Sequence, residues 1–396
     1  MELRGILEQA RELEGYLTEI RRGIHKNPEL GFQERKTTAL VREELARLGL
    51  EIQPLELETG VVALLRGSGS GPDTATGLRA DMDALPVTER TGLPYASENR
   101  GVMHACGHDG HVALLLGTAH ILSGLRDRFS GVVKFLFQPA EELLTGARAL
   151  IAAGCLQNPP LDRIIAAHGW PYIAVGKIGV LAGPAMASAD RFKVRIKGRG
   201  GHGAYPHRAV DPILAAAHAV TAMQGIISRE TDALERAVLS VCTMEGGRAF
   251  NVIPREALLE GTVRCMREGL REEIRRRLER VVKGTATAFG CEGDLEWTEL
   301  VPPLVNDPEL TRTVEETARE VLGPDRVEEL PGPTMGSEDF SLYLQEGPCG
   351  VLFRLGLALP GKKIMGLHND QFDFTDAALP VGAAMLAGLV LRIHGS

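Results

Sequence analysis

The sequence predicts an α/β protein, in which a twisted, mostly parallel sheet is covered by helices and carries an inserted α+β domain. Two observations lead to this prediction. In the first half of the chain, short and almost wholly apolar segments alternate with helical segments, which is typical of a parallel sheet buried on both faces. After residue 183, strands of alternating polarity and two helices follow in the order β-α-β-β-α-β, the ferredoxin-like split motif.

Local patterns define the elements of the larger domain. Helical periodicity over residues 4–24 and 36–48 is interrupted between them by Pro28 and Gly31. Buried strands are expected at residues 60–66, 77–82, 132–138, 164–167 and 351–356. Further helices are expected at residues 107–123 and 145–153 and from about residue 376.

The inserted domain is expected over residues 184–296, so that residues 1–183 and 297–396 form the larger domain. A helix begins near Asp211, and Pro212 fits its first turn, where proline is tolerated. The second helix is expected at residues 270–289, and strands at 191–197, 237–244, 257–264 and 294–300.

Composition excludes several classes of protein. The chain has 396 residues and a net charge of −8, so it is a poor candidate for binding nucleic acid through phosphate contacts. Six cysteines are too few for a disulfide scaffold, and the first residues have no apolar signal-peptide core. The longest apolar run, residues 377–391, is short and contains Pro380, so no membrane span is expected. These features predict a cytoplasmic protein.

Possible metal ligands and acid–base groups follow the predicted strands. In open α/β sheets, ligands bind beyond the carboxyl ends of the strands, so side chains at these ends converge on one edge. The candidates at this edge are Asp83, Cys106, His108, Glu141, Glu142, His168 and His368. A thiolate, imidazoles and carboxylates together suit a divalent transition metal.

The pair Glu141–Glu142 adds a possible mechanism. Neighbouring side chains beyond a strand point in different directions, so one carboxylate can bind metal while the other faces a water molecule. Metal-assisted hydrolysis needs this combination of a Lewis acid and a base. From the residues alone, His111 is an alternative ligand to His108, and each candidate also has an ordinary structural interpretation. The G-x-G-x-x-G pattern from Gly198 to Gly203 lacks a following βαβ unit and does not predict a dinucleotide site.

Seven motifs resemble one known family. In order they are RADMDALP (79–86), MHACGHDGH (103–111), FQPAEE (137–142), GGHGA (200–204), FNVIP (250–254), MGSEDF (335–340) and LHN (367–369). Together they resemble the aminoacylase/carboxypeptidase family of dinuclear metallopeptidases. Within it the chain is similar to the amidohydrolase branch of N-acyl-amino-acid amidohydrolases, hippurate hydrolases and auxin-conjugate hydrolases. The resemblance covers essentially the whole chain.

The resemblance implies roles for individual residues. Glu141 would be the general base, Asp83 would orient a ligand, and the inserted domain would be a lid and dimerisation domain. His202, supplied by the partner subunit of a homodimer or dimer of dimers, would reach the substrate carbonyl. Asn251 and Arg264 would hold the substrate carboxylate. Two metal ions would be bound, with Cys106 as the bridge, by Cys106, His108, Glu142, His168 and His368.

One departure leaves the metal open. Many members of the wider family have a ligand in a His-x-Asp pair where this chain has Asp81-Met82-Asp83, a change that the amidohydrolase branch shares. Manganese, zinc, cobalt and nickel all remain possible. The expected reaction is metal-dependent hydrolysis of N-acyl amino acids or short peptides to release an amino acid. The alternatives are a carboxypeptidase acting mainly on peptides, a hydrolase with Cys106 as nucleophile, and a non-catalytic binding protein.

Overall fold

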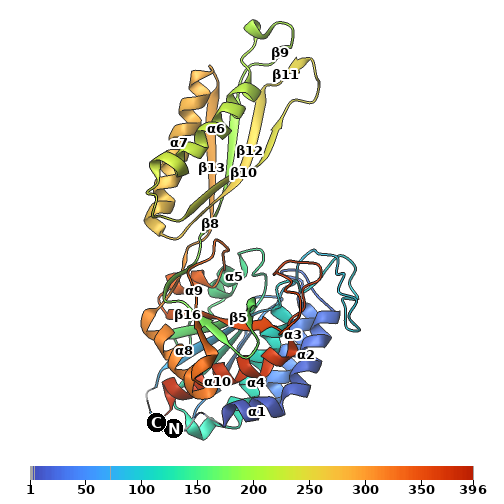
Figure 1. Cartoon of the computed structure of the whole chain (residues 1–396), viewed down its shortest axis with the longest axis vertical. Helices are drawn as coiled ribbons and strands as arrows, with labels where there is room; N and C mark the ends of the chain where they lie inside the picture. The colour runs from blue at the N-terminus through green and yellow to red at the C-terminus, as the bar shows by residue number, and fades with distance from the viewer. Residues whose placement is uncertain (1–2, 4, 72, 396) are drawn as a thin grey trace. The chain divides into compact units, whose positions relative to one another are not determined.

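The chain folds into two compact units in a computed structural model, which describes residues 3, 5–71 and 73–395 (Figure 1). The large unit comprises Met1–Gly183, Val305–Gly332 and Asp339–Ser396. The small unit comprises Pro184–Leu304 and Pro333–Glu338. The small unit therefore extends beyond the predicted range 184–296, because strand β13 (Glu292–Val301) continues past residue 296 and a later segment joins it.

The large unit is built on a mixed sheet with the strand order β1-β2-β4-β3-β5-β16-β6-β15. Its central strands β4, β3, β5 and β16 run parallel, and β1, β2 and β6 join it by antiparallel pairing. This confirms the predicted mostly parallel sheet. The strands are β1 (Glu51–Ile52), β2 (Val61–Arg66), β3 (Ala75–Asp81), β4 (Val132–Gln138), β5 (Arg163–Ala174), β6 (Ile178–Val180), β15 (Val327–Glu329) and β16 (Cys349–Ala358).

Helices cover this sheet. Helix α4 is buried along nearly its whole length, because most of its residues are apolar and it packs against α2 and α10. The helical stretch Asp376–His394, which includes α10, is long and apolar enough to cross a membrane, but 78% of its apolar window is buried, as expected for a core helix. The helices are α1 (Ile6–Glu12), α2 (Glu14–Lys26), α3 (Arg35–Arg47), α4 (His108–Ser123), α5 (Gly146–Ala152), α8 (Pro308–Val321), α9 (Ser341–Gln345) and α10 (Leu379–His394).

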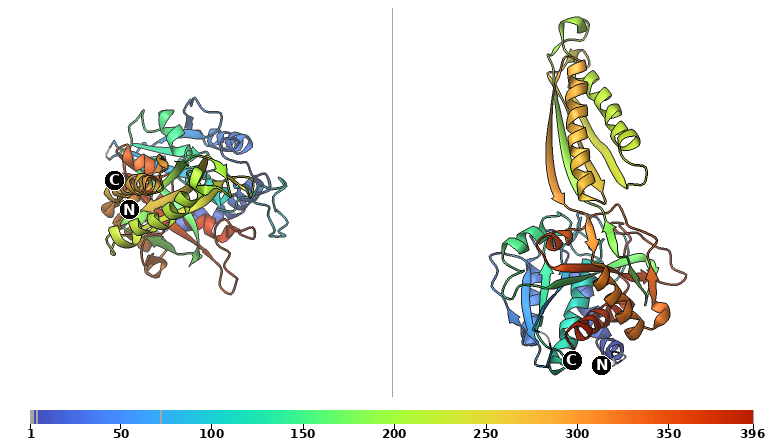
Figure 2. Two further views of the ribbon diagram at one scale, coloured as in Figure 1. Left: turned by 90° about the horizontal axis from the view of Figure 1, so that it is seen from above. Right: turned by 90° about the vertical axis from the view of Figure 1, so that its left-hand side faces the viewer.

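The small unit has the predicted ferredoxin-like order of elements. Its sheet has the strand order β10-β12-β8-β13, all antiparallel, and helices α6 and α7 lie side by side on it (Figure 2). Short strands β9 and β11 pair outside this sheet, and β7 (Gly183–Met186) and β14 (Leu304–Asn306) lie where the chain passes between the units. The remaining elements are β8 (Ala189–Lys197), β9 (Gly201–His202), α6 (Pro212–Glu230), β10 (Ala237–Gly246), β11 (Val252–Ile253), β12 (Glu256–Cys265) and α7 (Glu268–Ala288).

Two predicted boundaries are wrong. The helix expected over residues 4–24 is divided at Leu13 into α1 and α2. The strand expected to end at residue 167 continues to Ala174, because β16 pairs with β5 beyond His168, at Gly169, Trp170 and again at Ala174. His168 therefore lies within a strand and not in a loop.

Candidate metal centre

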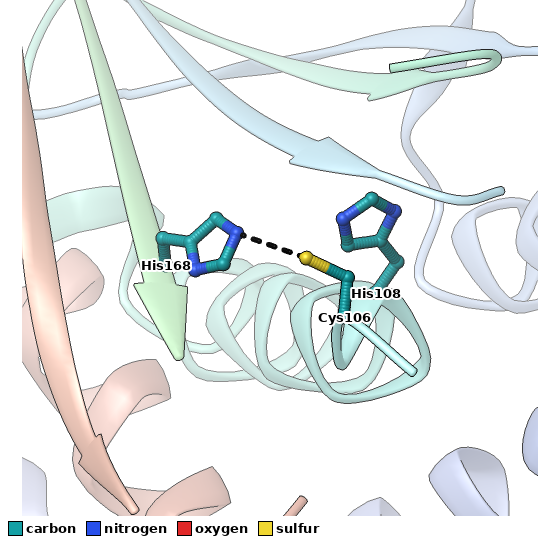
Figure 3. Close-up of side chains that lie close together, drawn as sticks. All are labelled: Cys106, His108 and His168. Carbon is teal, nitrogen blue, oxygen red and sulfur yellow. Dashed lines mark hydrogen bonds between the residues drawn. The ribbon is translucent and has the colours of Figure 1, made fainter. Parts of the chain in front are cut away.

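The predicted ligands from the large unit come together at one edge of its sheet. Cys106 and His108 stand at the start of α4, where Gly107 has the left-handed φ of 86° that this turn requires. The sulfur of Cys106 lies 3.7 Å from Nε2 of His168 on β5 (Figure 3). Ligand atoms of Cys106, His108 and His168 all lie within 4.8 Å of one another, and all three side chains are buried.

A second group of ligand atoms shares the same cysteine. Atoms of Cys106, Glu142 and His368 also lie within 4.8 Å of one another. Nε2 of His368 is 3.2 Å from Oε1 of Glu142, and the His368 amide donates a hydrogen bond to Ala105 in the turn before Cys106. Cys106 is thus common to two groups of three possible ligands.

The carboxylate of Asp83 contacts three other candidate residues at this edge of the sheet. It accepts hydrogen bonds from the backbone amides of Glu141 and Glu142, each at 3.0 Å, and lies 3.3 Å from Nδ1 of His108. These contacts fix the turn that follows β4 and the orientation of the His108 ring. The Nε2 atom of His108 points away from Asp83 and lies 4.0 Å from Oε2 of Glu141.

His111, the alternative ligand, has both ring nitrogens occupied. Nδ1 lies 2.6 Å from Oδ1 of Asp81, and Nε2 accepts the amide hydrogen of Gly169 at 2.8 Å. By contrast, Nε2 of His108 is buried without a hydrogen-bond partner among the described residues. The geometry therefore favours His108 over His111 as a ligand. Sequence reasoning missed the roles of Asp81 and His111, although their positions in the RADMD and HDGH motifs pointed to this edge.

The electrostatics of these side chains are suited to bound cations. Burial and the carboxylates of Glu142 and Glu141 raise the pKa of the Cys106 thiol well above its ordinary value, so a thiolate there needs positive charge beside it. Burial lowers the pKa of His168, which keeps the imidazole neutral, as a ligand must be. Burial opposes a charged His108, but Asp81 and Asp83 outweigh it and raise the pKa of His108 to about 10, and a metal ion at this ring would take the place of that proton. A thiol, imidazoles and carboxylates around an unpartnered nitrogen fit divalent transition metals.

The three predicted substrate-binding residues lie in the small unit. His202 on β9 pairs with Val252 on β11, and the neighbouring Gly203 amide donates to the Asn251 carbonyl at 2.8 Å, so His202 and Asn251 are close together. Both are exposed. The β9–β11 pair lies beyond the Lys197–Glu256 end of the sheet (Figure 1).

Arg264 is at the opposite end of this sheet. Its guanidinium donates to the Ser337 hydroxyl, which in turn donates to the Ser188 carbonyl. Arg264 is eight positions along β12 from Glu256, which corresponds to about 26 Å of extended strand. Within one small unit, Arg264 is therefore not brought together with His202 and Asn251.

The comparisons with known proteins identify the family. Residues 77–392 match the model of peptidase family M20/M25/M40. The chain belongs to this family. It is 42% identical over 342 residues to the N-acetyl-L-cysteine deacetylase of Bacillus subtilis, covering 86% of this chain and 80% of the relative. It is 37% identical to the hippurate hydrolase of Campylobacter jejuni, over 98% of this chain and 99% of the relative.

A solved structure agrees with these relatives. A dinuclear metal-binding peptidase of family M20 from Bacillus subtilis superposes with a TM-score of 0.85 at 36% identity, over 97% of this chain and 99% of the other. The family that the seven motifs predicted is thus confirmed, and the M20 chain is a hydrolase.

Proposed function

We propose that this M20 hydrolase cleaves the amide bond of N-acyl amino acids or short peptides and releases a free amino acid. The observation that carries the proposal is the position of Cys106 in two groups of three ligand atoms, each within 4.8 Å. Two sets of ligands that share one sulfur are suited to a pair of metal ions. Relatives named as a deacetylase, a hippurate hydrolase and a dinuclear metal-binding peptidase support the same reaction class.

Two divalent ions fit these residues. Cys106 would bridge them, with His108 and His168 on one side and Glu142 and His368 on the other. Bound ions of this kind supply Lewis acidity, which polarises a carbonyl and lowers the pKa of a water molecule. Manganese, zinc, cobalt and nickel are all compatible with this mixed donor set.

Glu141 would act as the general base. Its side chain is 7% exposed, and its backbone amide is held by Asp83 beside that of Glu142. From this position the carboxylate would take a proton from the attacking water and return it to the leaving nitrogen. Asp83 would keep Glu141, Glu142 and His108 oriented without touching the substrate.

The small unit would serve as a lid and as the dimerisation domain, and the rest of the chain as the catalytic domain. His202 would stabilise the developing oxyanion, while Asn251 and Arg264 would hold the substrate carboxylate. Because His202 and Arg264 lie at opposite ends of one sheet, a single small substrate needs them from different chains. This supports a homodimer in which each site borrows His202 from its partner. The edge strand β10, with Cys242 and Met244 exposed, is suited to such pairing.

A chelation assay tests the proposal. N-acyl amino acids and short peptides are assayed before and after EDTA treatment and after adding back each of the four metals. We expect EDTA to abolish hydrolysis and metal to restore it. Hydrolysis that survives chelation would instead favour Cys106 as nucleophile, a preference for peptides would favour a carboxypeptidase, and no turnover with any metal would favour a binding protein.

The proposed compartment is the cytoplasm. All six cysteines are free thiols, and this agrees with a reducing environment, where unpaired cysteines are usual.

A further inference from the structure

Arg354 on β16 is a buried cation without an anionic partner among the residues that the structure describes. Arg354 is only 6% exposed to solvent. Its guanidinium group stacks on the ring of Trp170, 3.9 Å from the ring centre. Among the described residues, no carboxylate, carbonyl or hydroxyl accepts a hydrogen bond from it. Burial lowers the pKa of Arg354 to about 10, so the group is still charged at neutral pH.

The other buried arginines of the described chain are paired with carboxylates. Arg21 lies 2.8 Å from Asp373, and Arg79 lies 3.0 Å from Asp339. Arg271 donates to Asp190 at 2.9 Å. This is the usual condition for a buried charge, because an unpaired one costs folding free energy. Arg354 is the exception, and the described part of the large unit does not supply its counter-charge.

The surroundings of Arg354 explain why it has no partner. On its own strand, the residues that share its face are Leu352 and Gly356, and the residue opposite it on β6 is Gly179. The space beside Gly179 is filled by Ile173 and Leu330, since a Cβ there would lie 2.5 Å and 2.7 Å from their side chains. None of these side chains offers a hydrogen-bond acceptor.

On its other side, Arg354 adjoins the candidate metal centre. It is opposite His168 in the parallel register of β16 and β5, so both side chains point to the same face of the sheet. Trp170 is two residues beyond His168 on that face, and their rings are 6.3 Å apart. Stacking on Trp170 occupies only the flat face of the guanidinium, and the N–H groups lie in its plane and remain available.

We propose that Arg354, held in place by Trp170, binds a carboxylate of the substrate beside the metal centre. This deepens the proposed function and rests on it, because it assigns a charged substrate class to the same site. The shared chemistry is a carboxylate a few bonds from the scissile amide. It can come from the amino-acid side chain, from the acyl group or from the α-carboxyl group, and matched substrates distinguish these sources.

Three pairs of substrates test the proposal. N-acetylglutamate and N-acetylglutamine differ in the side-chain carboxylate, N-succinylleucine and N-butanoylleucine in the acyl carboxylate, and N-acetylleucine and its amide in the α-carboxylate. For each pair, the ratio of kcat/KM for the substrate with the carboxylate to kcat/KM for the neutral substrate is measured. In one pair we expect Arg354→Gln to lower this ratio about 10- to 100-fold, the effect of losing a charge-assisted hydrogen bond. That pair identifies the source. Unchanged ratios in all three pairs would overturn the proposal.

Arg128→Gln is the matched control. Arg128 is exposed in the turn Arg126–Arg128, before the start of β4 and so at the amino ends of the parallel strands. The ratios should be the same in this variant as in the unaltered enzyme. A loss in Arg128→Gln equal to that in Arg354→Gln would make the effect one of overall charge and would contradict a specific site.

Binding and stability supply readouts that do not need turnover. Glutarate binding to the metal-loaded enzyme, measured by calorimetry, should weaken about 10-fold or more in Arg354→Gln, even if none of the substrates is cleaved and the proposed function fails. The melting temperature of Arg354→Met should equal or exceed that of the unaltered enzyme, since an unpaired buried charge is removed. Equal glutarate affinity, or a lower melting temperature, would show that Arg354 is a structural residue.

Discussion

His111 is held by Asp81: its Nδ1 atom lies 2.6 Å from Oδ1 of the carboxylate. This hydrogen bond fixes the proton on Nδ1 and leaves Nε2 as an acceptor, which receives the Gly169 amide at 2.8 Å. Gly169 follows His168 directly, and the His168 Nδ1 atom lies 2.9 Å from the Gly169 carbonyl. Asp81 and His111 therefore hold the backbone beside His168, and hydrogen bonds occupy both ring nitrogens of His111.

Replacing His111 should weaken metal binding. In His111→Phe the ring volume is retained, but the Asp81 carboxylate and the Gly169 amide lose the hydrogen bonds that His111 makes. We expect metal affinity and kcat/KM to fall about 10- to 100-fold, as for other residues that orient ligands. Chelator competition measures the affinity, and His111→Gln, which keeps one donor and one acceptor, should recover part of it. Equal metal affinity in His111→Phe would rule out a positioning role.

Glu141 is expected to affect the reaction and not the metal. Glu141→Gln removes the base but keeps the shape of the side chain, so kcat should fall more than about 100-fold, the usual contribution of a positioned base. Metal analysis should still find the same metal content as in the unaltered enzyme. Normal turnover in this variant would assign the base to another residue.

Cys106 is expected to affect metal content directly. In Cys106→Ala both groups of ligand atoms lose their shared member, so metal occupancy and activity should fall together. Cys106→Ser should also be poor, because a hydroxyl remains protonated near neutral pH and bridges two cations weakly. Cys242→Ala is the control, since Cys242 is exposed in the small unit and should not affect metal content. Two ions per chain in Cys106→Ala would contradict the bridge.

Much of this site was predictable from the sequence because parallel strands end at a common edge. That rule brought together Asp83 and the two glutamates, whereas Cys106 precedes a helix and His168 lies within β5, which continues past it. The choice between His108 and His111 was not predictable, because both lie on one face of α4 and only the Asp81 contact separates them. The role of Arg354 was not predictable either, because it stands in no motif. Its lack of a carboxylate partner depends on which residues face it from the neighbouring strands β5 and β6.

A buried ion pair near the metal centre should make stability depend on pH. Nδ1 of His25 lies 2.8 Å from Oδ2 of Asp109, and both side chains are fully buried. Burial opposes a charged His25, but Asp109 outweighs it and raises the pKa of His25 to about 9 from the ordinary 6.5. The folded chain thus binds this proton more tightly than the unfolded chain. Its stabilising effect is complete below pH 6.5 and is lost as the pH rises through 9.

Melting curves between pH 6 and pH 9.5 test this expectation. Over that interval the unaltered protein should lose on the order of 1–3 kcal/mol of unfolding free energy from His25. His25→Gln should be less stable at low pH and should show a flatter pH dependence. His207→Gln, at an exposed histidine of the small unit, should keep the slope of the unaltered protein. Equal slopes in all three proteins would show that His25 does not titrate in this range.

The proposed exchange of His202 between subunits can be tested by complementation. His202→Ala and Glu141→Ala should each be nearly inactive alone. In a mixed dimer, the chain that carries His202→Ala still has Glu141, and it receives an intact His202 from its partner. One of the two sites in each mixed dimer should therefore work. With equal amounts and free exchange, half of the dimers are mixed, and about a quarter of the original activity should return, as two-fold symmetry requires. If subunit exchange is demonstrated and no activity returns, His202 acts within its own chain or not at all.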